Sequence, residues 1–208
     1  MTLPSKGHDS LVSLLAEDDI AAELRPAWRR DLQRWGRIRH LTRAVAASRP
    51  TWQAVVRAEQ MFAMMTRIDR ATQALICLYV SLLNGCGYCI DDAAGAALAE
   101  GLSPEQLLAV HAPTVETFEA RACAMLRYAY WVALQPAAVP AEVTDELRRH
   151  TDDEQLLELT AVIAMKCFWN RFASALQLPP EGRCPDPNLL HTLRGLSVHL
   201  RGGERTAW

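Results

Sequence analysis

Two cysteines separated by two residues are the one feature of the sequence that indicates chemistry directly. Cys86 and Cys89 lie in the stretch NGCGYC at residues 84–89. A pair with this spacing can be a redox-active dithiol, half of a zinc site or a structural bridge. Zinc would need further ligands at short spacing, but no two histidines lie within five residues of each other and the other cysteines are dispersed: Cys77, Cys123, Cys167 and Cys184. The sequence therefore predicts no metal site and favours a redox pair.

The elements around this pair place it at a helix N-terminus. Residues 69–83 are almost continuously apolar and predict a buried helix, which is short of the ~20 residues needed to span a bilayer. Asn84 and Gly85 break that helix, and residues 93–100 continue as a helix of small residues that Gly101 ends. The positive end of the second helix would favour a thiolate at the pair.

Other polar side chains are candidates for the same site. Asp92 lies three residues after the second cysteine and so on the same helical face, where its charge would oppose a thiolate. Lys166 lies in an apolar stretch, where burial would lower its pKa and make it a base; we favour the alternative that its ammonium reaches solvent. Tyr88 and Gln73, with Lys166, are predicted to bind substrate. Glu59, close to the apolar face of a helix over residues 51–63, is a reserve candidate.

Composition excludes several classes of protein. The chain has 208 residues, half of them hydrophobic, which is enough for one core with appendages. A net charge of −2 gives no global attraction for nucleic acid, and no stretch resembles a secretory signal or membrane anchor. We expect a cytoplasmic protein without a nucleic-acid or membrane partner.

One segment is nevertheless strongly basic. Residues 25–49 hold eight arginines against the single acid Asp31, together with Trp28, Trp35 and His40. Such a segment could contact nucleic acid or a phosphate-bearing ligand. We favour arginines on the solvated face of a helix, with the tryptophans facing inward or into an interface between subunits.

The rest of the chain predicts helices alone. Ser10 would cap a helix through residue 20, and further helices are expected over residues 104–110, 114–134, 140–150 and 153–176, followed by a short one in the tail. No segment alternates with the period of two that a half-buried strand shows, so the fold class is all-α. We divide the chain into an N-terminal extension with one helix (1–29), a helical domain (30–178) and a C-terminal appendage (179–208).

The cysteine stretch at the end of an apolar helix resembles the signature of the carboxymuconolactone decarboxylase and AhpD-like alkylhydroperoxidase superfamily. The segment 36–50, the helix after Gly101 and the helix that carries Asn170 and Arg171 support the resemblance, which covers residues 30–178. It implies an all-α, AhpD-like bundle built around a CxxC-bearing helix pair, and assembly into homo-oligomers.

The resemblance also implies roles for the two cysteines. In peroxidase-like members the second cysteine attacks a hydroperoxide and the first closes the disulfide, so Cys89 would attack and Cys86 would resolve. A glutamate and a histidine relay protons in those members, but the corresponding positions here are Ala74 and Ala93. Losing positioned acid–base help typically costs about 10²–10⁴ in rate.

Three functions stay open on this sequence. The first is a thiol oxidoreductase that needs no cofactor beyond the cysteine pair, reduces a peroxide or exchanges disulfides, and is recycled by a thiol reductant protein. Asp92 could then replace the missing base, and Gln73, next to the glutamate position, could donate a hydrogen bond. The second is a non-redox enzyme that decarboxylates, isomerises or tailors a small metabolite on the same scaffold, and the third is a non-catalytic assembly protein.

Overall fold

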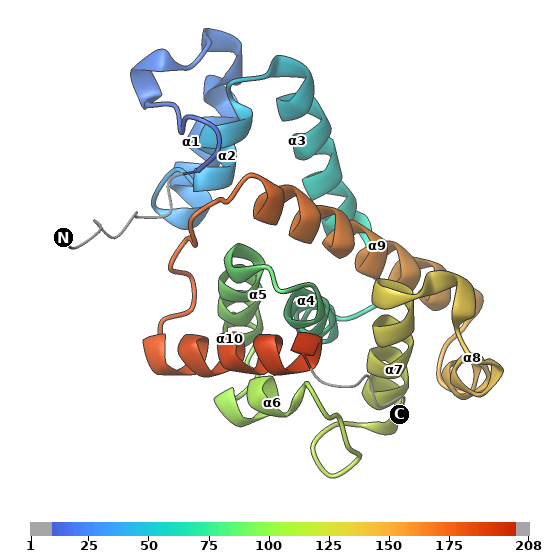
Figure 1. Ribbon diagram of the computed structural model, residues 1–208. Helices are drawn as coiled ribbons and strands as arrows, with labels where there is room; N and C mark the ends of the chain where they lie inside the picture. Colours follow the sequence, from blue (N-terminus) through green and yellow to red (C-terminus); the bar gives the residue numbers. More distant parts are fainter. Residues whose placement is uncertain (1–9, 203–208) are drawn as a thin grey trace.

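The computed structural model describes residues 10–202 and is all-α, as predicted; no strand occurs within that range (Figure 1). Short 3₁₀ turns lie at Glu17–Asp19, Ala22–Leu24 and Pro136–Ala138. The α-helices are α1 (Arg25–Trp35), α2 (His40–Val45), α3 (Arg49–Met64), α4 (Arg70–Asn84), α5 (Gly87–Ala99), α6 (Pro104–Ala109), α7 (Ala120–Leu134), α8 (Ala141–Arg148), α9 (Asp153–Ala175) and α10 (Pro187–Gly202).

Helix α4 is the centre of the main core. It packs against α5, α7, α9 and α10, and ten of its fifteen residues are buried, which explains its nearly continuous apolar sequence. Asp69 caps its first turn by accepting a hydrogen bond from the Thr72 N–H at 2.8 Å. Gly85 ends it in the left-handed conformation, with φ of 71°, a backbone state that glycine adopts without strain.

A second, smaller core lies among the N-terminal helices. Trp28 and Trp52 are its largest buried side chains, and Trp169 of α9 packs into it together with the two cysteines of the pair. Helix α9 therefore links the two cores: one end packs on α4 and α7, and the other passes beneath α1, α2 and α3 (Figure 1). The space between the two cores is where a cavity can form.

The chain after α9 returns across α5 before entering α10. We call residues 179–186 the C-terminal strap. The buried carboxylate of Asp91 on α5 accepts hydrogen bonds from the strap N–H groups of Arg183 (3.1 Å) and Cys184 (3.0 Å). Gly95 makes this close approach possible, because a Cβ there would lie 2.6 Å from the Arg183 carbonyl oxygen.

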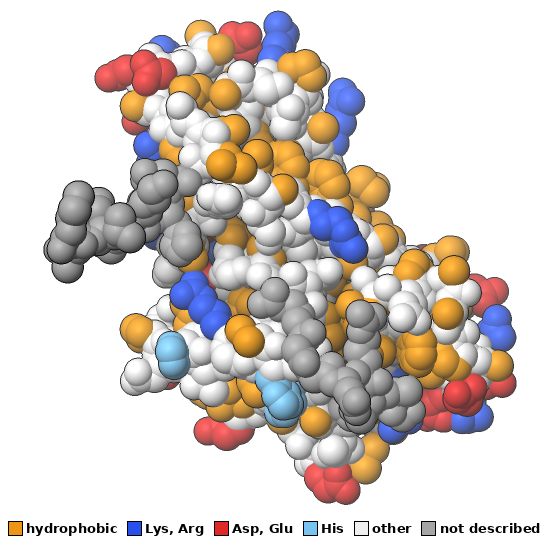
Figure 2. Space-filling view, viewed as in Figure 1, with side chains coloured by type: hydrophobic (Ala, Val, Ile, Leu, Met, Phe, Trp, Pro, Cys, Tyr) orange, Lys and Arg blue, Asp and Glu red, His pale blue; other side chains and the backbone are white. Residues whose placement is uncertain are grey.

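The predicted C-terminal appendage packs on the main body. Leu189 and Leu193 of α10 lie in the same hydrophobic cluster as α4 and α5, and Ser197 donates a hydrogen bond to the Leu82 carbonyl at 2.7 Å. On the face shown in Figure 2, hydrophobic side chains gather over α3 and α9. The large exposed ones on these two helices are Met61, Met64, Leu157 and Phe168. Assembly with further copies of the chain stays a prediction.

Two predicted helices are wrong in extent. Residues 11–20 form no α-helix, because their polar backbone groups bond elsewhere: Leu11 N–H donates to the Leu176 carbonyl, and Arg43 donates to the carbonyl of Leu15. Residues 114–119 are a turn, and α7 begins only at Ala120. At residues 11–20 tertiary contacts outweigh a helical spacing of apolar residues, whereas at residues 114–119 the backbone forms a local turn in which Thr117 and Phe118 donate to the Thr114 carbonyl.

No helix in the described part of the chain is long and apolar enough to cross a membrane.

Candidate functional site

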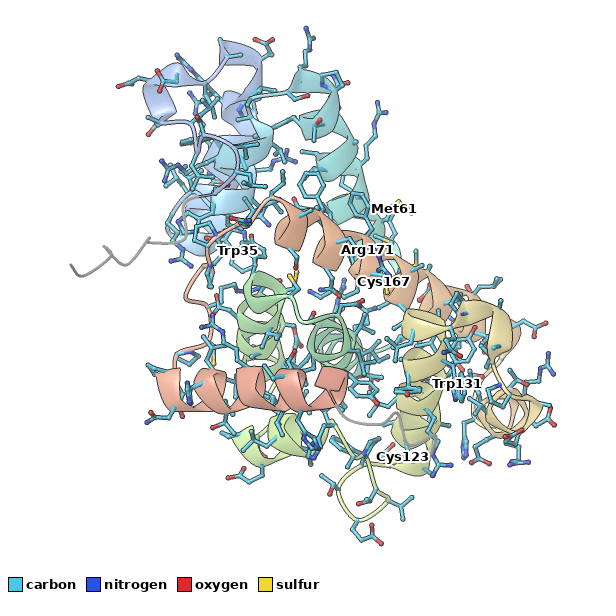
Figure 3. The ribbon with its side chains drawn as sticks, in the orientation of Figure 1. Trp35, Met61, Cys123, Trp131, Cys167 and Arg171 are labelled. Atoms are coloured by element: carbon cyan, nitrogen blue, oxygen red, sulfur yellow. The ribbon has the colours of Figure 1, made fainter. Side chains whose placement is uncertain are left out.

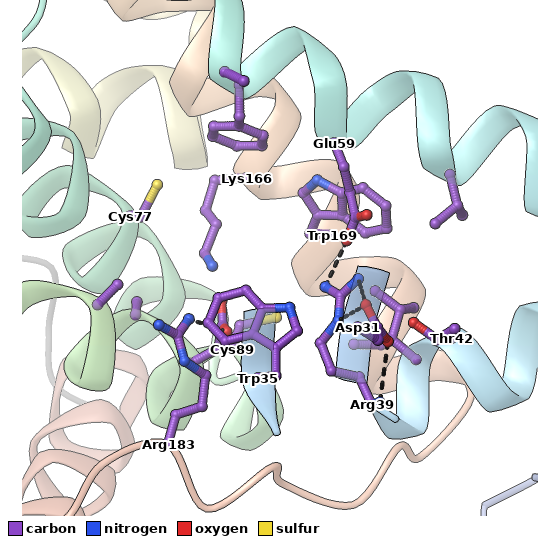
Figure 4. A pocket seen from close by; sticks show the side chains of 18 of the residues that line it. Asp31, Trp35, Arg39, Thr42, Glu59, Cys77, Cys89, Lys166, Trp169 and Arg183 are labelled. Atoms are coloured by element: carbon purple, nitrogen blue, oxygen red, sulfur yellow. Dashed lines mark hydrogen bonds and ion pairs between the residues drawn. The ribbon is translucent and has the colours of Figure 1, made fainter. Parts of the chain in front are cut away.

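A pocket of about 790 Å³ opens between the N-terminal helices α1–α3 on one side and α4, α5 and α9 on the other (Figure 4). Its walls are aromatic and aliphatic, and charged groups reach into it from α1, α3, α4, α5 and α9, from the residues just before α2 and from the strap. The lining residues that matter below are Asp31, Trp35, Arg39, Trp52, Glu59, Phe62, Gln73, Ala74, Cys77, Tyr88, Cys89, Asp92, Ala93, Lys166, Trp169 and Arg183. Its size lies within the range of small-molecule sites, about 300–1,000 Å³.

The two cysteines of the pair differ in access. Cys86 is the N-cap residue of α5, is fully buried and does not line the pocket. Its Sγ accepts a hydrogen bond from the backbone N–H of Cys89 at 3.2 Å. Cys89, one turn into the helix, does line the pocket. Both are free thiols, so the structure represents the reduced pair. A ligand in the pocket can reach Cys89, and only Cys89 can reach Cys86.

The pair shares its protons unequally. The hydrogen bond from the Cys89 thiol, with further ones from Ser174 and the Cys89 backbone, lowers the pKa of the Cys86 thiol to about 6 despite burial. The pKa of the Cys89 thiol is raised, because it donates to Cys86 and is itself buried. Two such thiols titrate as a unit, so at neutral pH the pair carries one negative charge and one proton.

Lys166 is buried, contrary to our expectation that its ammonium reaches solvent. Only 6% of the residue is exposed, and its side chain descends from α9 into the pocket between Cys77 and Cys89 (Figure 4). Burial opposes its charged form, but the negative charge at the cysteines and at Asp92 outweighs burial and raises the pKa of Lys166. The expectation of a solvent-exposed ammonium was wrong because a sequence does not show how many anionic groups surround a lysine.

Asp92 is paired and not free to act as a strong base. Its Oδ1 accepts a hydrogen bond from Arg183 Nη1 at 2.7 Å, and the Arg183 guanidinium lies 4.1 Å from the centre of the Trp35 ring (Figure 4). Burial would raise the pKa of Asp92, but Lys166 and Arg183 outweigh it and lower that pKa. The repulsion that we expected between Asp92 and a thiolate is therefore balanced by an arginine from the strap.

Tyr88 lines the pocket but its hydroxyl is used elsewhere. It donates to Glu181 Oε1 at 2.8 Å, and Glu181, which is 2% exposed, lies 3.6 Å from Nδ1 of His40. Burial and the Glu181 carboxylate raise the pKa of Tyr88 well above its usual value. The hydroxyl thus fastens the strap to α5.

Gln73 also has its polar atoms occupied. Its Nε2 donates to the carbonyls of Met65 (2.6 Å) and Ile68 (2.9 Å), and its Oε1 accepts from Arg70. These bonds hold the turn between α3 and α4. The Gln73 side chain therefore lines the pocket but has no free N–H group to offer a substrate.

Ala74 and Ala93, the positions that the resemblance assigns to a relay glutamate and histidine, both line the pocket. The methyl groups leave room where carboxylate and imidazole groups would otherwise stand, and Cys89 and Lys166 face the same space. The sequence shows that both positions are alanine, but only the structure shows that Lys166 lies beside them.

The reserve candidate Glu59 belongs to a separate charged cluster. Arg39 donates to Glu59 Oε1 at 2.6 Å and to Asp31 Oδ1 at 3.1 Å through its Nε, and Asp31 also accepts the Arg39 backbone N–H. Burial opposes the charge of Arg39, but the two carboxylates raise its pKa. An arginine that we assigned to a solvated face thus joins three N-terminal segments.

Sequence reasoning missed Arg183, Ser174 and part of the role of Asn170. Asn170 is buried, donates to Ser81 Oγ at 3.1 Å and offsets part of the rise in the pKa of Cys89. Both Asn170 and Ser174 lie on the face of α9 that meets α5, a spacing of four that could have signalled it. Arg183 had no such signal. The remaining cysteines lie apart, Cys123 on α7 and Cys167 on α9 (Figure 3), and the described residues contain no cluster of three metal-ligating groups.

Comparison with known proteins finds similarity to one family over the middle of the chain. The model of the carboxymuconolactone decarboxylase family matches residues 50–131. The uncharacterized protein YdfG of Bacillus subtilis is 29% identical over 119 residues, which is 56% of this chain and 81% of that protein.

Solved structures share the fold. The debrominase Bmp8 superposes with a TM-score of 0.75 at 22% identity, covering 90% of this chain and all of that one. It has also been solved, as a cysteine-to-alanine variant, with 2,3,4-tribromopyrrole. An uncharacterized peroxidase-related protein from Ralstonia eutropha, an AhpD core, gives a TM-score of 0.74 at 18% identity over 89% of this chain and 96% of that one.

Proposed function

Since the chain belongs to the carboxymuconolactone decarboxylase and AhpD-like superfamily, we propose that it is a thiol oxidoreductase that uses Cys86 and Cys89 to reduce an organic substrate by two electrons. The observation that carries the proposal is the division between the two thiols. Cys89 faces the pocket, and behind it Cys86 caps the helix and holds the negative charge. A nucleophile in contact with substrate and a resolving thiol in contact with the nucleophile are what such chemistry requires.

The chemistry with a hydroperoxide balances as follows. The Cys89 sulfur attacks the terminal oxygen of ROOH while its proton passes to the Cys86 thiolate, and the O–O bond breaks to give a Cys89 sulfenic acid and an alkoxide, which takes up a proton and leaves as ROH. Cys86 then attacks the Cys89 sulfur, a disulfide forms, and water leaves. The substrate is reduced and the pair is oxidised, and an external dithiol must restore it.

The pocket indicates what size of substrate to test. A cavity of about 790 Å³ walled by Trp35, Phe62 and Trp169 is large and apolar for hydrogen peroxide and suited to a molecule with a ring. We therefore propose an aromatic or otherwise bulky hydroperoxide, such as cumene hydroperoxide, as the better substrate.

The test is oxidation of the reduced protein by cumene hydroperoxide and by hydrogen peroxide, followed by intact mass and peptide mapping. We expect rapid formation of a Cys86–Cys89 disulfide, faster with the bulky reagent. Cys86→Ser should trap a sulfenic acid at Cys89, and Cys89→Ser should not react. Cys77→Ser is the matched control, since Cys77 lines the same pocket outside the pair. Thiols that oxidise no faster than free cysteine would contradict the proposal and leave a non-redox activity.

A second candidate uses the same two electrons on a carbon–halogen bond. The shared fold with Bmp8 and the aromatic pocket favour trying it. The thiol–thiolate pair and a bromoarene would give the arene, bromide and the disulfide, with the thiol proton ending on carbon. Release of bromide from 2,3,4-tribromopyrrole together with disulfide formation would support this activity. If the disulfide forms with a hydroperoxide but neither bromide nor disulfide forms with the bromopyrrole, this activity is excluded.

A further inference from the structure

We propose that Lys166 is the proton donor for the departing oxygen and so replaces the carboxylate and imidazole relay that this chain lacks. The proposal rests on the proposed function, because it assigns a role within the reaction of the cysteine pair.

The first argument is position. Ala74 on α4 and Ala93 on α5 line the pocket beside Cys89, and neither methyl group can carry a proton. Lys166 enters that space from the opposite wall, on α9, and its ammonium points toward the cysteine side of the cavity (Figure 4). A substrate oxygen bound over Cys89 would therefore lie next to the ammonium.

The second argument is charge. Within the described residues Lys166 has no hydrogen bond and no carboxylate within 4 Å, although it is 6% exposed. The groups facing it are Cys77 from α4, the cysteine pair and Asp92 from α5, and Arg183 from the strap. Asp92 also binds Arg183 at 2.7 Å, so the negative charges that balance the buried ammonium are the carboxylate of Asp92, which Lys166 shares with Arg183, and the thiolate of the pair.

The third argument is proton count. Turning a hydroperoxide into an alcohol and water takes two protons besides the one that the hydroperoxide carries. The reduced site holds both: one on the thiol–thiolate pair and one on Lys166. When the Cys86 thiolate takes the proton of Cys89 during the attack, the negative charge passes to the departing alkoxide, and without the thiolate burial makes the ammonium a stronger acid. The ammonium is thus stable before the reaction and becomes acidic as the reaction proceeds.

The experiment measures single-turnover disulfide formation in Lys166→Met with two oxidants whose leaving groups differ. Cumene hydroperoxide expels an alkoxide that must be protonated, whereas peracetic acid expels a carboxylate that need not be, since carboxyl groups have a pKa of about 4. We expect Lys166→Met to lose about 10²-fold in rate with cumene hydroperoxide, as for other positioned acids, and much less with peracetic acid. Equal losses with both oxidants would overturn the proposal.

Lys166→Arg tests the same role in a variant that keeps the buried charge. A guanidinium supports the thiolate but gives up its proton far less readily, because its pKa exceeds 12. The absorbance titration of the thiolate should therefore stay near that of the wild type, while the rate with cumene hydroperoxide stays at least about 10-fold lower. Full recovery of the rate by arginine would show that charge alone matters and would refute proton donation.

Arg171→Met is the matched control. Arg171 lies on the same helix, is exposed and bonds only its own backbone at Cys167, so its removal should leave both rates unchanged (Figure 3). The two proposals fail differently. If the wild-type protein forms no disulfide with either oxidant, the proposed function fails. If it does, and Lys166→Met matches it, only the role of Lys166 fails.

Discussion

Two cations lie in the same pocket in opposite electrostatic situations. Arg39 is held between the carboxylates of Asp31 and Glu59, with N–O distances of 2.9 and 2.6 Å. Lys166 has no carboxylate within 4 Å in the described residues and faces a pair of thiols instead. Arg39 is compensated by two carboxylates of fixed charge, whereas Lys166 shares the carboxylate of Asp92 with Arg183 and depends also on a thiolate whose charge disappears when it reacts.

The difference in their partners gives Arg39 a structural role and Lys166 a chemical one. A guanidinium between two carboxylates has little reason to change its protonation, and its forked donors hold α1, α2 and α3 together. An ammonium whose partner is a thiolate is coupled to the redox state of that thiolate. The same burial therefore makes Arg39 a structural cation and Lys166 a reactive one.

Breaking the structural cation should have the largest effect on stability. Arg39→Met leaves Asp31, which is 5% exposed, without its partner, and removing one member of a buried pair typically costs about 3–5 kcal/mol. We expect a loss of about 3 kcal/mol in the free energy of unfolding by urea. Glu59→Gln is the control, because 35% of its side chain is exposed and the expected loss is below about 1 kcal/mol. Similar values for both would show that the cluster does not hold the N-terminal helices.

Displacing the strap should have the next effect, because Arg183 of the strap shares the charge of Asp92 with Lys166. Gly95→Ala puts a Cβ at 2.6 Å from the Arg183 carbonyl oxygen and should cost about 1–3 kcal/mol of stability. Gly195→Ala, with no atom within 4 Å of the added Cβ, should stabilise α10 by about 0.5–1 kcal/mol. Thermal unfolding of the two variants would measure this contrast, which disappears if the strap moves freely.

The thiolate itself should be visible in the pH dependence of its ultraviolet absorbance. Because the pKa of Cys86 is lowered to about 6, the thiolate absorbance of the reduced protein should rise with a midpoint near pH 6. The folded pKa lies below the unfolded value of about 9, so the reduced protein should gain stability as pH rises from 6 to 9. The disulfide form should show no such gain. Equal pH profiles for the two forms would contradict the assignment.

The smallest effect should be the contribution of Asp92 to the stability of the protein at acidic pH. Its folded pKa lies below the ordinary 3.8, so the unfolded chain takes up the proton first, and the contribution to stability is lost as pH falls below about 5 toward the folded pKa. Arg183→Met removes one of the cations that lower that pKa and should flatten this part of the acid unfolding curve. An unchanged curve would show that Lys166 alone sets the charge of Asp92.

Much of this architecture could be predicted from local sequence. The caps at Asp69, Ser103 and Asp152 begin helices where the sequence places them, and Gly85 and Gly101 end them. The helix over residues 11–20 could not be excluded locally, because the competing bonds come from Arg43 and Leu176. A helical spacing of apolar residues predicts the burial of Ile20 here, but it predicts the exposed Leu11 and the backbone conformation wrongly.

By itself the sequence determined that the chain is all-α and that two cysteines stand at a helix N-terminus, since each of these depends on residues within a turn or two of one another. Only the tertiary structure decided which charges meet. Arg183 pairs with Asp92 across 91 residues, and Lys166 meets the cysteines from a helix that begins more than sixty residues after them. Protonation depends on burial and on neighbouring charge, and neither is encoded near the ionisable residue.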